Sequence, residues 1–508
     1  MNRHLVQNKK YENQLNLKRK ISYDLSRRLS FNNFSSNLIK YLLEFFTLNE
    51  YIEIKKVCIN LNKIISSMNI FQEYICLTKK IKAYPKNIPE TIFKDNAVFI
   101  TAKMSFEKFL LQEEKTKLYQ NFLHYYLRNR KTIYLPDTLR IGEMGFFYLA
   151  TYLCFLHNEI EVVNLNYNLI SDDSIRIFSD AIKINHTLKN IHLNGTNLPA
   201  ESCKILAEGI AINKNMEKFE MSYNNNLRLE GVEKLFTNLK KNSSIETLLF
   251  CDNSLRKEGA KVLAEFIKEN KILKKLFIEK NEFGDDGMRY IAEGLIKNKS
   301  LRVLNLSENR INHSGLKFLS QALNHNLNFS GKNVNTTLTH LFLKSNSFNN
   351  LESSKLLGDI VENNKSLIFL DLSNNYLSEN SIKPLSEALK ANKTLENLIL
   401  ETNGLGSLGS NILCEGLKYN TKLKFLNLRN NSLGFEGAKN ISDMLAVNKS
   451  LESLNLQSNL LDEHSISVIA DKIGYSPQLK SINISYNQIS NIQDLTMNLI
   501  FAKDILIY

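Results

Sequence analysis

Asparagine returns at a regular interval along most of this chain, and it is the residue type whose spacing first suggests chemistry. A primary amide carries two N–H donors and one carbonyl acceptor. A row of amides could bind a polar ligand, or it could hydrogen-bond a turning backbone whose own groups would otherwise be unpaired. Because each asparagine follows a short apolar segment, we expect the structural role. The row comprises Asn168, Asn224, Asn253, Asn281, Asn309, Asn346, Asn375, Asn403, Asn431, Asn459 and Asn487.

The other residues that could do chemistry are dispersed. The nine histidines are scattered among turns and helices, and the six cysteines show no C-x-x-C spacing. The sequence contains no phosphate loop, no zinc-ligand spacing and no nucleophile elbow. We therefore predict a protein that is not an enzyme and that needs no metal or other cofactor. The cysteine pattern is typical of reduced packing residues in a cytosolic or nuclear protein.

The asparagines belong to a longer phrase, L-x-x-L-x-L-x-x-N-x-L, that returns about every 28 residues. A short apolar strand phrase followed by a helical phrase at a fixed period indicates a solenoid, in which each unit buries its apolar face against its neighbours. Twelve copies open at Ile160, Leu188, Met216, Ile245, Leu273, Leu301, Leu338, Leu367, Leu395, Leu423, Leu451 and Leu479.

The second half of each copy has a helical period, as in residues 284–295 and 434–445. Apolar residues at i, i+3, i+4 and i+7 form one buried stripe on such a helix. The step between copies is 28 or 29 residues except for one of 37, between Leu301 and Leu338. The extra residues, around 326–336, are polar and predict a surface loop.

The strand, asparagine and helix phrases together resemble the ribonuclease-inhibitor subtype of leucine-rich repeats, over about residues 160–490. The resemblance implies an α/β fold: a leucine-rich-repeat solenoid with a curved parallel sheet inside and helices outside. In such a fold, partners bind on the surface and not in a pocket.

Alternation along each strand phrase predicts which side chains point away from the core, onto the concave face of the sheet. Several of them are apolar where solvent is expected, which is typical of an interaction site. We predict that they bind a protein partner; the alternative is that the rings only stack on one another across neighbouring strands. The predicted partner-binding residues are Leu249, Phe277, Val303, Phe342, Phe369, Ile399 and Phe425.

Positive charge is concentrated before the repeats. Residues 1–158 hold 25 Lys and Arg against 13 Asp and Glu, whereas the remainder holds 40 against 39. The densest stretch, residues 1–28, is poor in apolar residues and predicts a solvated, disordered arm. The alternative is that the arm grips an anionic surface, such as nucleic acid, an acidic tubulin-like protein surface or a nuclear import receptor.

Residues 29–93 turn apolar and helical, with Ser36 and Asn49 as candidate N-caps. This tract resembles an F-box, the helical module that docks on the Skp-type adaptor of cullin-RING ubiquitin ligases. The tract departs from the family pattern at two places: Asn33-Phe34 stands near the family's Leu-Pro, and Phe71 replaces its late Trp. A plain helical cap is the alternative. The adaptor-binding residues that the resemblance implies are Leu38, Ile39, Leu42, Val57, Cys58 and Phe71.

The ends of the repeat array suggest caps. Residues 94–158 contain Ile133-Tyr-Leu135 and a helical phrase with the repeat spacing, and they predict a transition ending in a degenerate capping repeat. The repeats follow over residues 159–490. Residues 491–508, with a helical apolar pattern and an apolar tail, predict a C-terminal cap.

An F-box before leucine-rich repeats implies a substrate receptor, in which the module recruits the ligase and the repeats hold the substrate. The alternatives are a structural or regulatory component of a ciliary or cytoskeletal assembly and a regulator like the Ran GTPase-activating protein. That last family typically has an acidic tail, whereas this chain ends in an apolar one. The absence of a long apolar run and of a secretory h-region predicts a cytoplasmic protein without a membrane span, with nuclear or ciliary placement as alternatives.

Overall fold

The computed structural model describes residues 131–135, 146, 149–150, 153, 159–324, 334–379, 381–489 and 506–507. The basic arm, the F-box-like module with its six adaptor-binding residues, and the closing helix expected after residue 490 lie outside the described residues. The described chain divides into two compact units. The first includes residues up to Glu217 together with Lys241–Ser244, and the second includes Lys218–Lys240 and everything from Ile245 onward.

The first unit contains three parallel strands and two helices among its described residues. They are β1 (Thr132–Tyr134), β2 (Val162–Asn164), α9 (Asp172–Ile184), β3 (Asn190–His192) and α10 (Ala200–Ile212). The register pairs Ile133 with Val163 and Val163 with Ile191. Ile133 is fully buried, so the first strand phrase of the predicted capping repeat forms a regular strand. The boundary of that capping segment stays a prediction.

The second unit repeats one strand and one helix from β4 to β13, and all its strand pairs are parallel. Its elements are β4 (Lys218–Glu220), α11 (Arg228–Leu239), β5 (Thr247–Leu249), α12 (Arg256–Glu269), β6 (Lys275–Phe277), α13 (Gly284–Lys297), β7 (Val303–Asn305), α14 (His313–Leu323), β8 (His340–Phe342), α15 (Leu351–Asn363), β9 (Phe369–Asp371), α16 (Lys383–Ala391), β10 (Asn397–Ile399), α17 (Gly406–Leu417), β11 (Phe425–Asn427), α18 (Gly434–Val447), β12 (Ser453–Asn455), α19 (Glu463–Ile473), β13 (Ser481–Asn483) and β14 (Leu506–Ile507).

Each strand from β4 to β13 is three residues long, and its middle residue enters the core. Leu276, Leu304 and Leu341 are all fully buried between the sheet and the helices. Each helix adds one apolar stripe to this core, which in α13 includes the buried Ile291 and Leu295. Burying one such side chain stabilises the fold by roughly 1.5–3 kcal/mol, so the stripes of successive units build a continuous core.

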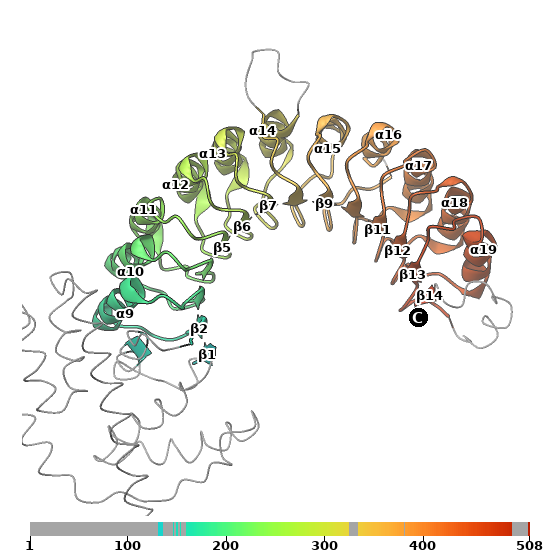
Figure 1. Cartoon of the computed structure of the whole chain (residues 1–508). Coiled ribbons are helices and arrows are strands. Elements are labelled where there is room, and N and C mark those ends of the chain that lie inside the picture. Colours follow the sequence, from blue (N-terminus) through green and yellow to red (C-terminus); the bar gives the residue numbers. More distant parts are fainter. Residues whose placement is uncertain are drawn as a thin grey trace, which may run out of the picture. The chain divides into compact units, whose positions relative to one another are not determined.

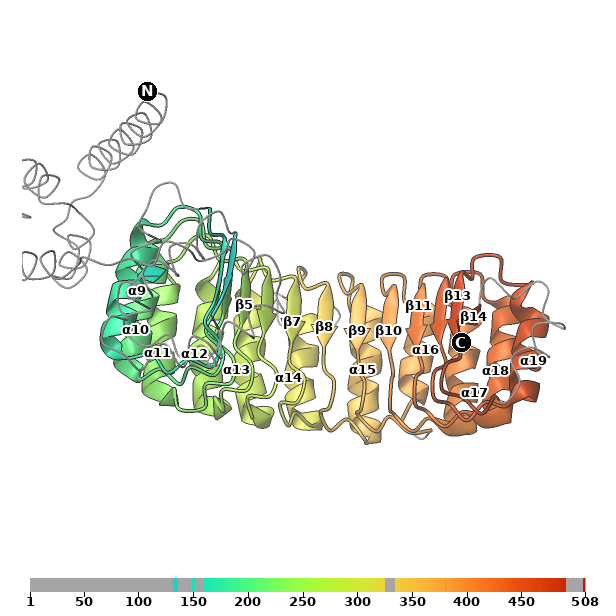
Figure 2. The same cartoon turned by 90° about the horizontal axis from the view of Figure 1, so that it is seen from below.

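The helices of the second unit cover only one face of its sheet. Figure 1 shows α11 to α19 along the outer side of this curved unit and the strands along its concave side, and Figure 2 shows the strands running side by side. We call the face of this sheet that is turned away from the helices the inner face. It carries the first and third residues of each strand, because successive side chains of a strand point to opposite faces.

The last residues of the predicted surface loop are not at the surface. Residues 325–333 lie outside the described part, but Val334 and Asn335 are buried. Asn335 donates from Nδ2 to the carbonyl oxygen of Leu295 at 2.9 Å. The prediction of a loop through residue 336 was therefore wrong at its end, because those residues already belong to the next unit.

In the described residues, no helix has the length and the apolar content that crossing a membrane would require.

Candidate functional site

The inner face carries one of the seven predicted apolar residues on each of seven successive strands. Leu249, Phe277, Phe342 and Ile399 are third residues of their strands, and Val303, Phe369 and Phe425 are first residues. We call these seven residues the inner-face band. All seven are half-buried, whereas a fully solvated position had been expected. Each side chain therefore keeps apolar surface that a partner could cover.

An aromatic cluster occupies the centre of the band, on β8 and β9. The ring centroids of Phe342 and Phe369 lie 4.8 Å apart with their planes tilted by 38°. The imidazole of His340 stacks on Phe369, with centroids 5.6 Å apart and an interplanar angle of 18°. We call His340, Phe342 and Phe369 the aromatic cluster. The alternative that rings stack across strands is thus true of Phe342 and Phe369, yet the stacked rings remain half-buried.

His340 was missed in the sequence, although it occupies the same strand position as Val303 and Phe369. Its Nδ1 lies 2.9 Å from the hydroxyl oxygen of Thr339. Burial lowers the pKa of His340, and the nearby charge of Lys275 lowers that pKa further. The imidazole is therefore neutral at pH 7 and behaves as a third, weakly polar ring in the cluster.

The inner-face band is not one unbroken apolar surface. Leu249 and Phe277 face each other across β5 and β6. Asp371, however, lies between Phe342 and Ile399 in the register, and Asn397 lies between Phe369 and Phe425. Polar residues therefore interrupt the band, since from β6 to β11 the apolar residue alternates between the third and the first strand position.

Polar residues at the third strand position have a structural use. Asn305 accepts a hydrogen bond from the backbone N–H of Ser307 at 2.9 Å. Asn427 does the same for Arg429 at 2.9 Å, and Asp371 accepts from the backbone N–H of Ser373 at 2.8 Å. These side chains hold the end of their own strand. The apolar side chains in this row, such as Phe277 and Phe342, cannot accept such bonds, so the turn does not explain their presence.

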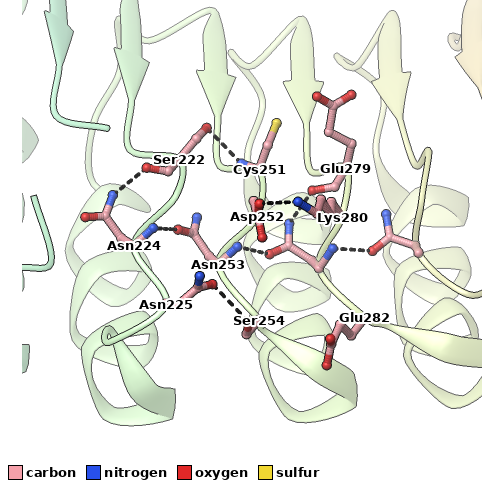
Figure 3. A network of polar contacts seen from close by, with 12 residues as sticks. Ser222, Asn224, Asn225, Cys251, Asp252, Asn253, Ser254, Glu279, Lys280 and Glu282 are labelled. Atoms are coloured by element: carbon pink, nitrogen blue, oxygen red, sulfur yellow. Dashed lines mark hydrogen bonds and ion pairs between the residues drawn. The ribbon is translucent and has the colours of Figure 1, made fainter. Parts of the chain in front are cut away.

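The recurrent asparagines form a buried ladder beneath the turns, as predicted (Figure 3). The backbone N–H of Asn253 donates to Oδ1 of Asn281, and the N–H of Asn281 donates to Oδ1 of Asn309, both at 2.9 Å. Nδ2 of Asn281 donates to the carbonyl oxygen of Phe250 at 2.8 Å. The turn needs these partners because the residue before each ladder asparagine is left-handed, with φ of 56° at Lys280. This row is structural and is not a binding site.

A second asparagine ladder, which the sequence reasoning missed, runs along the opposite ends of the helices. Nδ2 of Asn298 donates to the carbonyl oxygen of Ile267 at 2.7 Å, and its Oδ1 accepts from the N–H of Leu301 at 2.7 Å. The signal was an asparagine three residues before the opening residue in ten of the twelve copies, as in Asn-Lys-Ser-Leu at residues 298–301. The same pattern of bonds is made by Asn185, Asn213, Asn242, Asn335, Asn364, Asn392, Asn420 and Asn448.

Reactive side chains are not grouped in the described part of the chain. No three His, Cys, Asp or Glu side chains there lie together as metal ligands would. Burial, followed by the charge of Glu279, raises the pKa of the Cys251 thiol to about 12, and burial raises that of Cys414 to about 12. These thiols are protonated at neutral pH and are therefore poor nucleophiles.

Comparisons with known proteins agree with the repeat pattern. Residues 297–320 and 419–442 match the family described as Leucine Rich repeat. No curated protein matches the chain significantly.

Three solved structures are among those to which the chain is similar. A chain of the Rad7 and Elc1 complex in yeast is 14% identical with a TM-score of 0.40, and the match covers 72% of this chain and 94% of that one. The leucine-rich repeat-containing protein LegL7 from Legionella pneumophila is 19% identical with a TM-score of 0.39, over 58% and 93%. An internalin, InlF, from Listeria monocytogenes is 16% identical with a TM-score of 0.35, over 78% and 95%.

Proposed function

Because this chain is a leucine-rich repeat protein, we propose that it is a non-catalytic scaffold that holds a protein partner against the inner face of its second unit. One observation carries the proposal: seven successive strands each present one half-buried apolar side chain, with the aromatic cluster at the centre. Apolar surface of this kind marks interaction sites, and aromatic anchors commonly supply most of the binding energy.

The repeat subtype is part of this proposal. Units of 28 or 29 residues that pair one strand with one α-helix of up to 14 residues, such as α13, support the ribonuclease-inhibitor subtype. An α-helix is wider than the spacing between neighbouring strands, so the helix layer of the stack takes up more length than the sheet. A wide helix layer bends the sheet inward, which suits a surface that wraps around part of a partner.

The finer function concerns the F-box-like segment. We propose that the protein is a substrate receptor, in which residues 29–93 dock on a Skp-type adaptor and the inner face holds the substrate. A structural role in a ciliary or cytoskeletal assembly is the competing proposal. Deleting residues 31–80 separates them: loss of a co-purifying Skp-type adaptor supports the receptor, whereas retained co-fractionation with salt-stable filaments supports the structural role.

The inner face itself is tested by Phe277→Ala, Phe342→Ala and Phe369→Ala together. We expect every partner bound at this face to be lost, because truncating a central aromatic anchor commonly costs about 2 kcal/mol or more of binding. Tyr376→Ala, Tyr419→Ala and Tyr475→Ala form the matched control, since these rings are 63%, 64% and 58% exposed and lie outside the band.

Circular dichroism and thermal unfolding of both triple variants establish that each is folded. The proposal is wrong if partners that co-purify with the natural chain bind the inner-face variant with unchanged affinity.

A further inference from the structure

Most charged side chains along the strands of the second unit are paired between neighbouring repeats. Residues one repeat apart stand side by side on adjacent strands, so a Lys or Arg in one repeat meets a Glu in the one before it. These pairs are Lys274 with Glu246, Lys424 with Glu396, Arg429 with Glu401, and Lys480 with Glu452. Such cations are already matched by a carboxylate before any partner arrives.

Two lysines beside the aromatic cluster depart from this pattern. Lys275 is the first residue of β6, in register with Val303, which is itself in register with His340. Lys344 lies in the turn after β8, two residues beyond Phe342 and next to the buried Leu343. Both side chains are exposed. Neither ammonium group makes a hydrogen bond or an ion pair with any residue in the described ranges.

The carboxylates near the cluster are occupied by neutral donors of the same face. Glu279 accepts from Nδ2 of Asn305. Asp371 accepts from the backbone N–H of Ser373 at 2.8 Å and from its hydroxyl at 2.6 Å. The inner face around the rings therefore offers two cationic donors without acceptors, whereas Glu279 and Asp371 each already accept a hydrogen bond from a neutral group.

We propose that the segment held on this face is an acidic peptide with one apolar anchor. The anchor packs on the aromatic cluster, and two carboxylates close to it in the peptide accept hydrogen bonds from Lys275 and Lys344. This inference rests on the proposed function and adds the chemistry of the partner. A lysine ammonium group that loses its hydration water at an interface without gaining an acceptor weakens binding. A carboxylate forms the strongest hydrogen bond with such a group, so it is the acceptor we expect in the partner.

The positions of the lysines set a spacing for the peptide. Lys275 lies two strands from His340, which is about 10 Å at the usual distance between strands. Lys344 lies two residues from Phe342, which is about 7 Å along an extended strand. An extended peptide advances by about 3.3 Å per residue. Because the first distance runs across the strands and the second runs along them, one straight peptide does not pass both lysines. We therefore expect two acidic residues within about three positions of the anchor, with no fixed order of sides.

The probe is a random-peptide phage library selected on the full chain. We expect the recovered peptides to carry Asp or Glu at those distances from a Phe, Leu, Ile or Trp. Synthetic copies of the recovered sequences are then titrated by fluorescence anisotropy against three proteins: the natural chain, K275Q/K344Q and the control K274Q/K424Q. The two variants lose the same charge, but the control removes cations that are already paired.

We expect K275Q/K344Q to bind the acidic peptide about tenfold more weakly, as two exposed ion pairs of modest strength would predict, and the control to bind it within a factor of about two. The same loss should follow from replacing the peptide's Asp and Glu by Asn and Gln. Raising the salt from about 0.05 M to about 0.3 M should weaken the natural complex and have less effect on K275Q/K344Q.

The outcomes separate this inference from the proposed function. If F342A/F369A abolishes binding of the recovered peptides while K275Q/K344Q does not, the partner is apolar without being acidic, and only the inference falls. If neither pair of substitutions weakens any recovered peptide, or if no peptide is recovered, both fall. If a single-stranded oligonucleotide binds more tightly than the peptides and K275Q/K344Q weakens it, the face takes a nucleic acid, and the peptide proposal is overturned.

Discussion

The hydroxyl of Ser442 donates to the carbonyl oxygen of Val468 at 2.6 Å, and this bond ties α18 to α19. Ser386 makes the same bond to Ile412 between α16 and α17, also at 2.6 Å. Ser320 occupies the equivalent position on α14, but its buried hydroxyl has no hydrogen-bond partner within the described residues. The interface between α14 and α15 therefore lacks the hydrogen bond from a serine hydroxyl that joins the helices at two other interfaces of this unit.

This difference predicts opposite results for one substitution at two sites. Ser442→Ala should lower the free energy of unfolding by about 1 kcal/mol, because a buried hydrogen bond is lost. Ser320→Ala should leave it unchanged or raise it by up to about 1 kcal/mol, because an unsatisfied buried hydroxyl is removed. Urea unfolding followed by circular dichroism measures both. Equal destabilisation by the two variants would show that Ser320 has a partner in the protein.

The same interface should be the first to open. Where the long step of the repeat falls, the N–H of Asn309 lies 3.2 Å from Oδ1 of Asn346, and Nδ2 of Asn346 lies 3.2 Å from the carbonyl oxygen of Leu306. The bonds of Asn281 at the same places are 2.9 and 2.8 Å. Ser353 and Ser354 of α15 also have buried hydroxyl oxygens without partners in the described part of the chain.

Hydrogen exchange followed by mass spectrometry measures this opening. We expect peptides from α14 and α15 to exchange faster than peptides from α12, α13, α17 and α18, since local opening follows the weakest contacts. Uniform protection from α12 to α18 would contradict the prediction.

Much of this fold follows from the sequence, because one period governs both the core and the turns. Leu276 and Leu304 occupy the predicted core positions, and Asn281 makes the predicted bonds to the turning backbone. Each of these roles is local or involves the neighbouring copy, so a repeating phrase is enough to reveal it.

The inner face was harder to predict. Alternation identifies Phe342 and Phe369 as facing away from the core, but it cannot show that they lean on each other and on His340. That contact depends on the side-chain rotamers and on the 37-residue step between copies before β8, and the repeat period predicts neither. Asn298 was missed for another reason: a polar residue after a helix is typical of a loop, and only the stacked neighbour supplies the carbonyl that makes it part of a ladder.

Asn281→Ala tests the first ladder. The substitution leaves the buried N–H of Asn253 without its acceptor and the carbonyl oxygen of Phe250 without a donor. Each buried group left unsatisfied costs roughly 1–3 kcal/mol, so we expect a loss of about 3 kcal/mol in the free energy of unfolding. Asn225→Ala is the control, because that exposed side chain only bonds the hydroxyl of Ser254. A similar small loss for both variants would show that the ladder contributes little.

Thiol reactivity supplies the last prediction. Burial is the main reason that the pKa values of Cys251 and Cys414 are raised to about 12. At pH 8 only about one folded molecule in ten thousand carries the thiolate at either site, and the thiolate is the reactive form. Iodoacetamide should therefore leave both residues unmodified in the folded protein and label both in guanidinium chloride.

Glu279→Gln refines this prediction, because the charge of Glu279 is the second cause of the raised pKa of Cys251. Removing that charge should lower the pKa of Cys251 and speed its alkylation severalfold, whereas Cys414, whose pKa is raised chiefly by burial, should keep its rate. Mass spectrometry of both peptides from one sample makes Cys414 the internal control. If both rates rise together, the substitution has loosened the whole stack, and the electrostatic explanation for Cys251 is wrong.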